Sequence, residues 1–408
     1  MHDDMTTREN RKPAVRRIIL AGGVMAVVSA AVVFGVLLCR QSEPSYGGRS
    51  LTFWLERYSE LSISCNQLSY EDQTNGTAQR IIVNSEEHRA LQQIGADAVP
   101  TLLRLVSTPD HSAISDKLAS FAAEHGLSRW LPQRHDPKRM RVLGEWGFDA
   151  LSSDDAQEAV PGLIAILTHP ASPACAASAA SCLRFIGPSA SPAVPALLAS
   201  LNSTNLEVQW ECALALGQIG AKPSLVVPEL RKLLKEDSSD MSYQVVEAAA
   251  GSLAAFGKDA APAVPDLIHL YSEYIDPDED IEGIGSFDHV RLGLQGAAED
   301  ALTRITRKPL FRVFMSALSE TNDRDVRLSA LHALGDPHFK PEVIVPALVA
   351  VLQDKDAEVR CHALNAIEVF GPKAKTASAV VARLLRDQDP QVRSAATNAV
   401  KSINLRRR

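Results

Sequence analysis

The chain has 408 residues, 46% of them hydrophobic but only 5% aromatic, and a formal net charge of −7 at pH 7. This length is sufficient for a large core, and small aliphatic side chains in place of aromatic ones are typical of thin helical layers. Because nucleic-acid binding depends on clustered Lys and Arg, the acidic balance predicts no nucleic-acid partner. The basic stretch at residues 406–408 is expected instead to favour the dipole at the end of the last helix.

The segment from Ile18 to Leu38 contains no charged residue. As a helix it is long enough to cross the core of a bilayer, which is about 30 Å thick. Only Arg40 follows it closely, whereas several basic residues precede it, namely Arg8, Arg11, Lys12, Arg16 and Arg17. The positive-inside bias therefore predicts a cytoplasmic tail at 1–17, a single-pass membrane anchor at 18–38, and a remaining chain that lies outside the cytoplasm, in the periplasm or cell envelope.

A cleaved signal peptide is the alternative interpretation of this segment. Its apolar run is longer than the usual run of about 7–15 residues. No A-x-A cleavage site follows it, and residues 36–39 (VLLC) lack the small residue that cleavage before Cys39 needs. These features favour an uncleaved anchor.

Residues 39–84 are predicted to form a linker, a first capping helix and an irregular loop. A linker at 41–50 leads through Tyr46-Gly47-Gly48-Arg49-Ser50-Leu51 into Trp54-Leu55, where the first helix is expected to start. Trp54 is expected to act as an apolar plug on a first unit that has no preceding neighbour. Residues 62–82 have no helical period and are predicted to be a loop.

Residues 85–158 are predicted to be degenerate opening repeats with an insertion, because Pro161 follows Pro100 by 61 positions. The insertion interleaves basic and aromatic side chains, which predicts a surface for an anionic partner such as a phospholipid head group, a polyanionic glycan or an acidic protein face. The candidate residues are Arg129, Trp130, Arg134, Lys138, Arg139 and Trp146. The alternative is a longer helix pair whose Trp residues pack inward and whose charges face water.

From residue 159 to residue 408 one pattern keeps returning. Val-Pro pairs open apolar stretches at Val160, Val194, Val227 and Val264, at intervals of 34, 33 and 37 positions, and the pattern resumes at Val345 after a much longer interval. A Gly closes the second stretch of the unit at residues 187, 220, 257 and 371. A self-similar unit of this length indicates a solenoid, in which no unit buries its apolar face alone.

Each unit is predicted to be two helices. In the stretch that begins at Val345, the residues Val345, Leu348, Val349 and Leu352 share one helical face, and Pro346 suits the first turn. The second helix carries an Ala-rich inward stripe, which lets neighbouring helices approach closely.

Two further ladders share this register. Asp323, Asp356 and Asp389 recur at the interval of the repeat, as do Arg327, Arg360 and Arg393. We expect the Asp residues to cap the second helices and the Arg residues to link adjacent turns.

The combination of VPxLxxLL, a short Asp-bearing turn, VRxxAxxAL and a closing IG resembles HEAT repeats, particularly the short bacterial type related to phycobilisome lyases. The resemblance covers roughly residues 85–405. It implies an all-α, right-handed α-solenoid of stacked helical hairpins, of the HEAT/ARM kind, here joined to one N-terminal transmembrane helix. It also implies that the Asp and Arg ladders are structural residues.

An acidic run interrupts the array at Asp276, Asp278 and Asp280. Its first three acids match the spacing of an EF-hand loop, but Ile281 stands where Gly is needed and Phe287 where the bidentate Glu should be. A solvated loop is therefore expected, with a calcium site as the alternative.

No catalytic motif occurs in the sequence. There is no GxSxG, HExxH, P-loop or CxxC motif, and His332 and His362 lie at non-equivalent repeat positions, so we expect packed or surface histidines. Disulfides are chemically allowed if the chain is exported, but Cys175 and Cys182 lie too far apart along one helix for a bridge. Buried thiols that act as small apolar side chains are therefore favoured for the six cysteines.

These features predict a membrane-anchored scaffold that mediates protein–protein interaction on the extracytoplasmic side, with no enzyme activity and no cofactor. The partners are a protein and, through residues 18–38, the membrane. The alternative is an enzyme or enzyme subunit of the lyase-like HEAT type that acts on a bound prosthetic group.

Overall fold

The computed structural model describes residues 43–66, 77–111, 113–124, 135–235, 242–273, 286–321 and 323–405. The described residues fall into two compact units, one up to Thr101 and one from Leu102 onward. The predicted anchor at 18–38 lies outside the described residues. Within the described ranges, no helix combines the length and the apolar character needed to cross a membrane.

The first unit begins with a small hairpin. Strands β1 (Ser45–Tyr46) and β2 (Arg49–Ser50) pair antiparallel, and the turn between them uses Gly47 and Gly48 at φ +58° and +77°. Two successive positive φ angles favour Gly at both positions of such a turn. The predicted lead-in to the first helix is therefore a folded hairpin, and not part of an extended linker.

Three helices and a helical turn complete the first unit: α2 (Leu51–Asn66), α4 (Thr77–Val83), α5 (Glu86–Ile94) and η1 (Gly95–Ala98). Trp54 is 4% exposed, and its Nε1 donates to the carbonyl of Tyr46 at 3.1 Å, which ties the hairpin to α2. The prediction of a loop at 62–82 is wrong at both ends, because α2 continues to Asn66 and α4 begins at Thr77. Packing of α2 on α4 and α5 compensates for the weak helical period of this segment.

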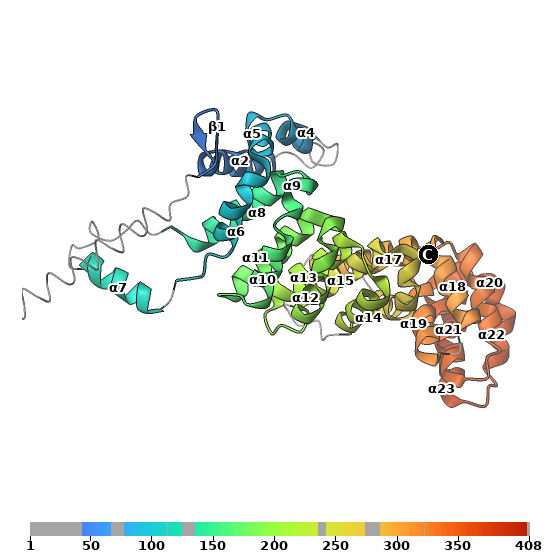
Figure 1. Ribbon diagram of the computed structural model, residues 1–408. Coiled ribbons are helices and arrows are strands. Elements are labelled where there is room, and N and C mark those ends of the chain that lie inside the picture. The colour runs from blue at the N-terminus through green and yellow to red at the C-terminus, as the bar shows by residue number, and fades with distance from the viewer. Residues whose placement is uncertain are drawn as a thin grey trace, which may run out of the picture. The chain divides into compact units, whose positions relative to one another are not determined.

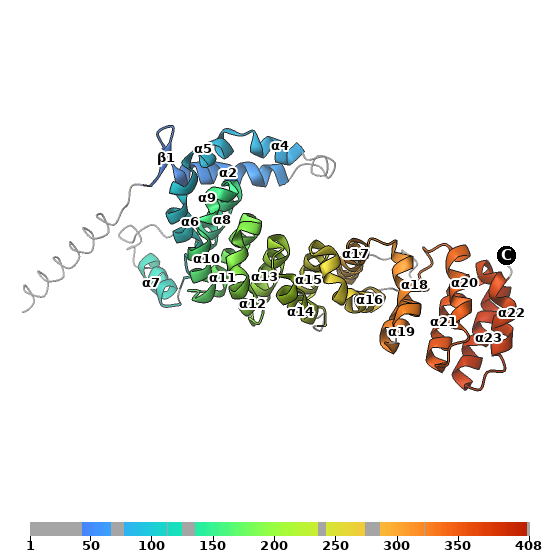
Figure 2. The ribbon, with the colours of Figure 1, turned by 45° about the vertical axis from the view of Figure 1, so that its right-hand side comes forward.

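The second unit is a series of helix pairs (Figures 1 and 2). The boundary between the units falls within α6 (Val99–Val106), and the second unit continues with α7 (Ala113–Glu124), α8 (Pro137–Ala150) and α9 (Ser153–Gln157). The first helices of the pairs are α10 (Val160–Thr168), α12 (Val194–Ser200), α14 (Pro223–Leu233), α16 (Val264–Glu273), α18 (Leu310–Glu320), α20 (Pro341–Val351) and α22 (Ser378–Leu384). The second helices are α11 (Pro173–Ile186), α13 (Leu206–Ile219), α15 (Tyr243–Ala255), α17 (Ser286–Thr306), α19 (Arg324–Leu334), α21 (Ala357–Phe370) and α23 (Pro390–Asn404).

The core of this unit lies between the two layers of helices. Small buried side chains such as Ala180 and Ala213, both 0% exposed, allow α11 and α13 to pack closely. The 3-10 turns η3 (Gly187–Ala193), η4 (Gly257–Ala263) and η5 (Gly371–Ala377) each start with a Gly at positive φ and lead into the next first helix. The Gly that recurs in the sequence therefore serves to reverse the chain at the end of each of these second helices.

The Asp ladder caps three second helices. Asp323 accepts from the backbone N–H of Asp325, Asp356 from that of Glu358, and Asp389 from that of Gln391. Capping of this kind satisfies amide groups that have no partner inside the helix.

The Arg ladder reaches from one repeat to the next. Arg327 pairs with Asp354, and Arg360 makes a two-pronged contact with Asp387 at 3.0 and 2.8 Å. In the last repeat, Arg393 donates to the carbonyl of Asp387 at 2.8 Å. Asp354 and Asp387 are themselves separated by the interval of the repeat, so they form a third ladder that the sequence analysis missed.

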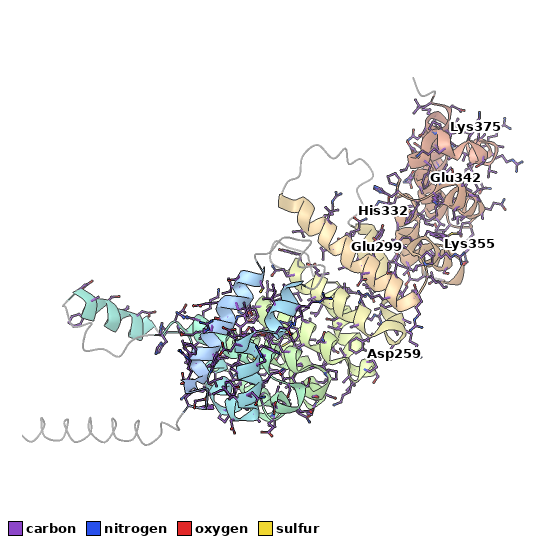
Figure 3. The ribbon with its side chains drawn as sticks, turned by 90° about the horizontal axis from the view of Figure 1, so that it is seen from above. Asp259, Glu299, His332, Glu342, Lys355 and Lys375 are labelled. Atoms are coloured by element: carbon purple, nitrogen blue, oxygen red, sulfur yellow. The ribbon has the colours of Figure 1, made fainter. Side chains whose placement is uncertain are left out.

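We expect Asp356→Ala to destabilise the protein by about 1–2 kcal/mol, because it removes the cap of α21 and the acceptor for Arg324 Nε at 2.8 Å. Asp356→Asn keeps a capping oxygen and should recover most of that loss. Lys355→Ala is the control, because Lys355 is an exposed neighbour (Figure 3). Chemical unfolding followed by circular dichroism measures all three, and equal losses for Ala and Asn would assign the effect to the ion pair instead.

Candidate functional site

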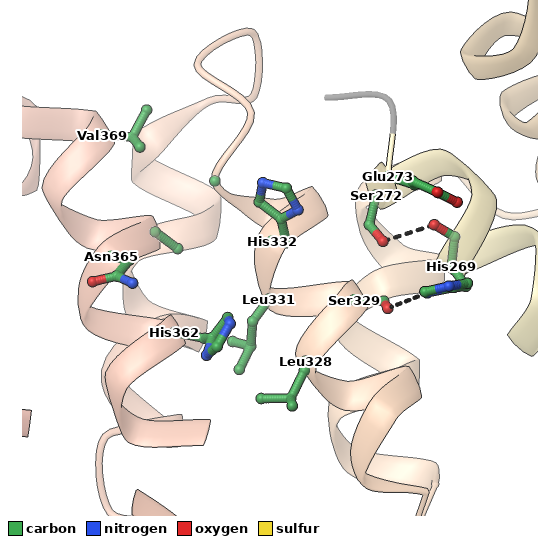
Figure 4. A pocket seen from close by; sticks show the side chains of 12 residues that line it. His269, Ser272, Glu273, Leu328, Ser329, Leu331, His332, His362, Asn365 and Val369 are labelled. Carbon is green, nitrogen blue, oxygen red and sulfur yellow. Dashed lines mark hydrogen bonds between the residues drawn. The ribbon is translucent and has the colours of Figure 1, made fainter. Parts of the chain in front are cut away.

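A hollow on the second unit lies where α16, α19 and α21 meet (Figure 4). It has a volume of about 590 Å³. We call it the histidine hollow, after the residues His269 on α16, His332 on α19 and His362 on α21 that line it. Its floor is apolar, with Leu331 and Ala366 buried beneath it.

A break in the stacking explains why the hollow exists. The second helices α13, α15, α17, α21 and α23 each pack against the preceding second helix. In contrast, α19 packs against the first helix α16. The long interval between the Val-Pro pairs at Val264 and Val345 spans this break, and the surface of α19 and α21 beside α16 is left open.

An aromatic cluster packs α16, α18 and the end of α19 together at this break in the stacking. The ring centroid of Phe314 on α18 lies 5.1 Å from that of Tyr271 on α16 and 6.2 Å from that of Phe339. The hydroxyl of Tyr271 donates to the carboxylate of Asp336 at 3.2 Å, and burial raises the pKa of Tyr271. These contacts fix α16 against α18 and the end of α19.

His332 and His362 are neutral near pH 7. Burial lowers the pKa of His332, and the neighbouring His362 lowers it further. Burial also lowers the pKa of His362, with Arg324 as the second cause. His362 Nδ1 lies 3.0 Å from the carbonyl of Glu358. Figure 4 shows the contact of His269 Nδ1 with Ser329 Oγ, at 3.2 Å. The hollow thus offers an apolar floor with hydrogen-bonding groups at its rim, among them the exposed carboxylate of Glu273.

The sequence analysis did not bring these histidines together. The interval between His332 and His362 is shorter than the repeat and out of step with it, and the two lie on α19 and α21, which pack against each other. The signal that could have found them is the long interval without a Val-Pro pair. Within the described residues, no group of three or more His, Cys, Asp or Glu side chains is arranged to hold a metal ion.

A second, smaller cavity of about 250 Å³ lies between α8, α11 and α13. We call it the carboxylate cavity, because Glu145, Glu207 and Glu211 line it together with Ser178 and Ser181. Burial raises the pKa of Glu211 to about 7, and Glu145 adds to this effect while Arg184 opposes it. Burial also raises the pKa of Glu145, against a hydrogen bond from Ser178.

We expect Glu211→Gln to change how stability depends on pH. A carboxyl with a raised pKa in the folded protein binds its proton more tightly there than in the unfolded chain, so its contribution is full below pH 4.5 and is lost as pH rises to about 7. The variant should therefore be more stable than the wild type at pH 8, by on the order of 2 kcal/mol, and should differ little at pH 5.

Thermal unfolding between pH 5 and pH 8 measures this difference. Glu342→Gln is the matched control, because Glu342 is exposed on α20 (Figure 3). A difference between Glu211→Gln and wild type that stays constant over this range would contradict the raised pKa.

The structure places part of the predicted basic and aromatic surface on α8. Lys138 and Arg139 are exposed in the first turn of α8, Trp146 is half-buried, and Lys138 lines the carboxylate cavity. Arg141 of the same helix is only 7% exposed and pairs with Asp110 at 2.8 Å. Other candidates, namely Arg129, Trp130, Arg134, Asp276, Asp278 and Asp280, lie outside the described residues.

The described cysteines are free thiols. Cys65, Cys175, Cys182 and Cys212 are buried, and Cys361 is half-buried. Burial raises the pKa of Cys182 and Cys212, so these thiols are protonated and act as small apolar side chains.

The fold and these surfaces define an α-solenoid of stacked helical hairpins. The family model for HEAT repeats matches residues 160–249, 194–279 and 311–401, which together make up just over half of the chain. The protein therefore belongs to the HEAT-repeat family, whose solenoids commonly serve as protein-interaction scaffolds.

The solved structures that match this chain are similar to it only at a low level, and no conclusion rests on them. An engineered protein is 19% identical with a TM-score of 0.30, over 88% of this chain and 97% of its own. A second engineered protein is 23% identical with a TM-score of 0.23, over 62% and 91%. Importin beta is 16% identical with a TM-score of 0.38, over 86% of this chain and 50% of its own. No curated protein matches the sequence.

Proposed function

We propose that this protein is a membrane-anchored scaffold whose HEAT repeats bind a protein partner on the extracytoplasmic side. The observation that carries the proposal is the histidine hollow. Its volume of about 590 Å³ is large enough for one or two side chains. An apolar floor with polar groups at the rim, Glu273 among them, suits a hydrophobic or aromatic anchor residue of a partner.

Site-specific photo-crosslinking tests this proposal. A benzophenone amino acid replaces Asn365, which is exposed at the rim of the hollow, in the full chain in intact cells. The same replacement at Glu342 on α20 is the matched control. We expect a discrete crosslinked partner from position 365 alone, and we expect Val369→Arg in the same chain to abolish it.

Two results would contradict the proposal. One is equal crosslinking from positions 365 and 342, which would indicate unspecific encounter. The other is a crosslink at position 365 that survives Val369→Arg, because Val369 is 36% exposed at the same rim.

The anchor and the location rest on the sequence. The uncharged segment at 18–38 and the basic residues before it support a cytoplasmic N-terminus and an exported solenoid. A reporter that is active only outside the cytoplasm, fused after Arg408, should be active. A cytoplasmic reporter with activity there would overturn the location but leave the scaffold proposal open to its own test.

The second candidate is a lyase-like HEAT enzyme or enzyme subunit that acts on a bound prosthetic group. Three histidines around a hollow of about 590 Å³ favour it, because such a space can hold a large planar ligand. An absorbance spectrum of the protein purified from its own cells separates the candidates. A visible absorbance band that is lost in His332→Ala and His362→Ala would support the enzyme, and a spectrum without such a band would remove it.

A further inference from the structure

Glu145, Ser178 and Glu211 follow one another at the interval of the repeat, so they occupy one repeat position on α8 and on the second helices α11 and α13. These helices pack side by side, α8 on α11 and α11 on α13. The three side chains line the carboxylate cavity in that order along the face of the second helices. The repeat thus places one carboxyl group on each side of a serine.

The cavity contains polar atoms that the described residues leave without hydrogen bonds. The side chain of Glu211 is 12% exposed, but its Oε2 is fully buried and has no hydrogen-bond partner among the described residues. The same holds for Nε of Arg184, which lies 3.5 Å from that oxygen as an ion pair without hydrogen-bond geometry. A buried carboxylate oxygen without a donor is costly, so an occupant that donates to it is stabilised.

The two arginines around the cavity have hydrogen-bonding partners other than its carboxyl groups. Arg141 donates to Asp110 Oδ1 and to the carbonyl of Thr108, both at 2.8 Å. Arg184 donates to Ser181 Oγ at 3.2 Å and stacks over the ring of Phe185 at 4.5 Å. Lys138 is exposed at the edge. Three carboxyl groups therefore share one incompletely engaged guanidinium and the exposed ammonium of Lys138.

We infer that the carboxylate cavity receives a basic side chain, an arginine or a lysine, from the protein partner. That the basic side chain comes from a protein partner rests on the proposed scaffold function. The affinity of the cavity for a cation can be tested separately with a small cationic probe. A guanidinium or ammonium group carries only donors, and the cavity offers carboxylate and hydroxyl acceptors. An anion would meet three carboxyl groups, and no metal-binding group of three or more side chains occurs among the described residues.

Binding of a cation at this site is coupled to proton release. Because the pKa of Glu211 is raised to about 7, a cation that binds the ionised form should bind about tenfold more tightly at pH 8 than at pH 6. The groups that face Glu211 are Glu145, Lys138 and Arg141 from α8, Cys182 and Arg184 from α11, and Glu207 of its own helix. The neighbour α12 carries no titratable residue, and Glu247 of α15 lies beside Gly293 of α17.

The test uses the purified full chain and N-acetyl-arginine amide as the probe. Saturation-transfer NMR observes the probe directly and measures weak dissociation constants. N-acetyl-citrulline amide is the neutral probe of the same shape. Glu211→Gln and Glu145→Gln are the cavity variants, and Glu342→Gln is the exposed control. Gln mimics the protonated carboxyl, so we expect these variants to fold, and circular dichroism checks this.

We expect the arginine probe to bind wild type and Glu342→Gln about tenfold more tightly at pH 8 than at pH 6. Glu211→Gln should bind it at least tenfold more weakly at pH 8 and without this pH dependence. Equal binding of the citrulline probe, unchanged binding by both cavity variants, or no binding at either pH would overturn the inference. Because the probe needs no partner, such a failure leaves the crosslinking test of the scaffold unaffected.

Discussion

Phe314→Ala is expected to destabilise the joint between α16 and α18–α19 by about 3–5 kcal/mol. Phe314 is 0% exposed and stands between Tyr271 and Phe339, so its removal leaves a cavity at the centre of the aromatic cluster. At this point α19 packs against α16 instead of α17, so the contacts that could compensate are few. In a solenoid the loss should stay near the altered repeat, because each repeat contacts only its neighbours.

Hydrogen exchange resolved by peptide measures this effect. We expect faster exchange in α18 and α19 and unchanged exchange in α11 and α13, which lie several repeats away. Phe311→Ala on the same helix is the control, because Phe311 is partly exposed and should cost less. Equal protection in α18 and α19 after both substitutions would show that the cluster does not hold the joint.

This substitution also tests how the histidine hollow is built. Since α16 supplies His269 while α19 and α21 supply His332 and His362, a loosened joint should widen the hollow. We therefore expect Phe314→Ala to reduce crosslinking from position 365 although Phe314 does not line the hollow. Stability of the joint and partner binding are coupled through the position of α19.

The sequence predicted the repeated part of the fold for a physical reason. In a stack where each pair meets the same neighbours, the same position needs the same chemistry, so the Val-Pro pairs, the closing Gly residues and the Asp caps recur in step. Asp354 and Asp387 also recur at one repeat position. A search for every residue type that recurs at the interval of the repeat would have found them. The same search would have found Glu145, Ser178 and Glu211.

The histidine hollow could not be predicted in this way. It arises where the regular repeat interval is interrupted, and the repeat pattern does not indicate how α19 packs against α16. The hollow that His332 and His362 line can be recognised only when that packing is known. The hairpin at Ser45–Ser50 was missed for a related reason, since such short strands carry too little pattern to be distinguished from a linker.

Gly217→Ala is expected to destabilise the array by about 3 kcal/mol, against the usual preference of helices for Ala. A methyl group at Gly217 on α13 would lie 2.6 Å from Cβ and 2.8 Å from Cα of Ser252 on α15. Ser252 cannot move away easily, because its hydroxyl donates to the carbonyl of Ala213 at 2.8 Å and its side chain is buried. The two helices would have to separate.

Gly251→Ala, immediately before Ser252 on α15, is the matched control. No atom lies within 4 Å of the added methyl group, and Gly251 is exposed, so helix propensity alone should stabilise this variant by about 0.5–1 kcal/mol. The midpoint temperature of thermal unfolding should therefore fall for Gly217→Ala and rise for Gly251→Ala. If Gly217→Ala also stabilises, α13 and α15 do not approach as closely as described. If Ser252→Gly restores part of the loss in the double variant, the contact between the two side chains is its cause, because that change removes the Cβ but leaves the Cα in place.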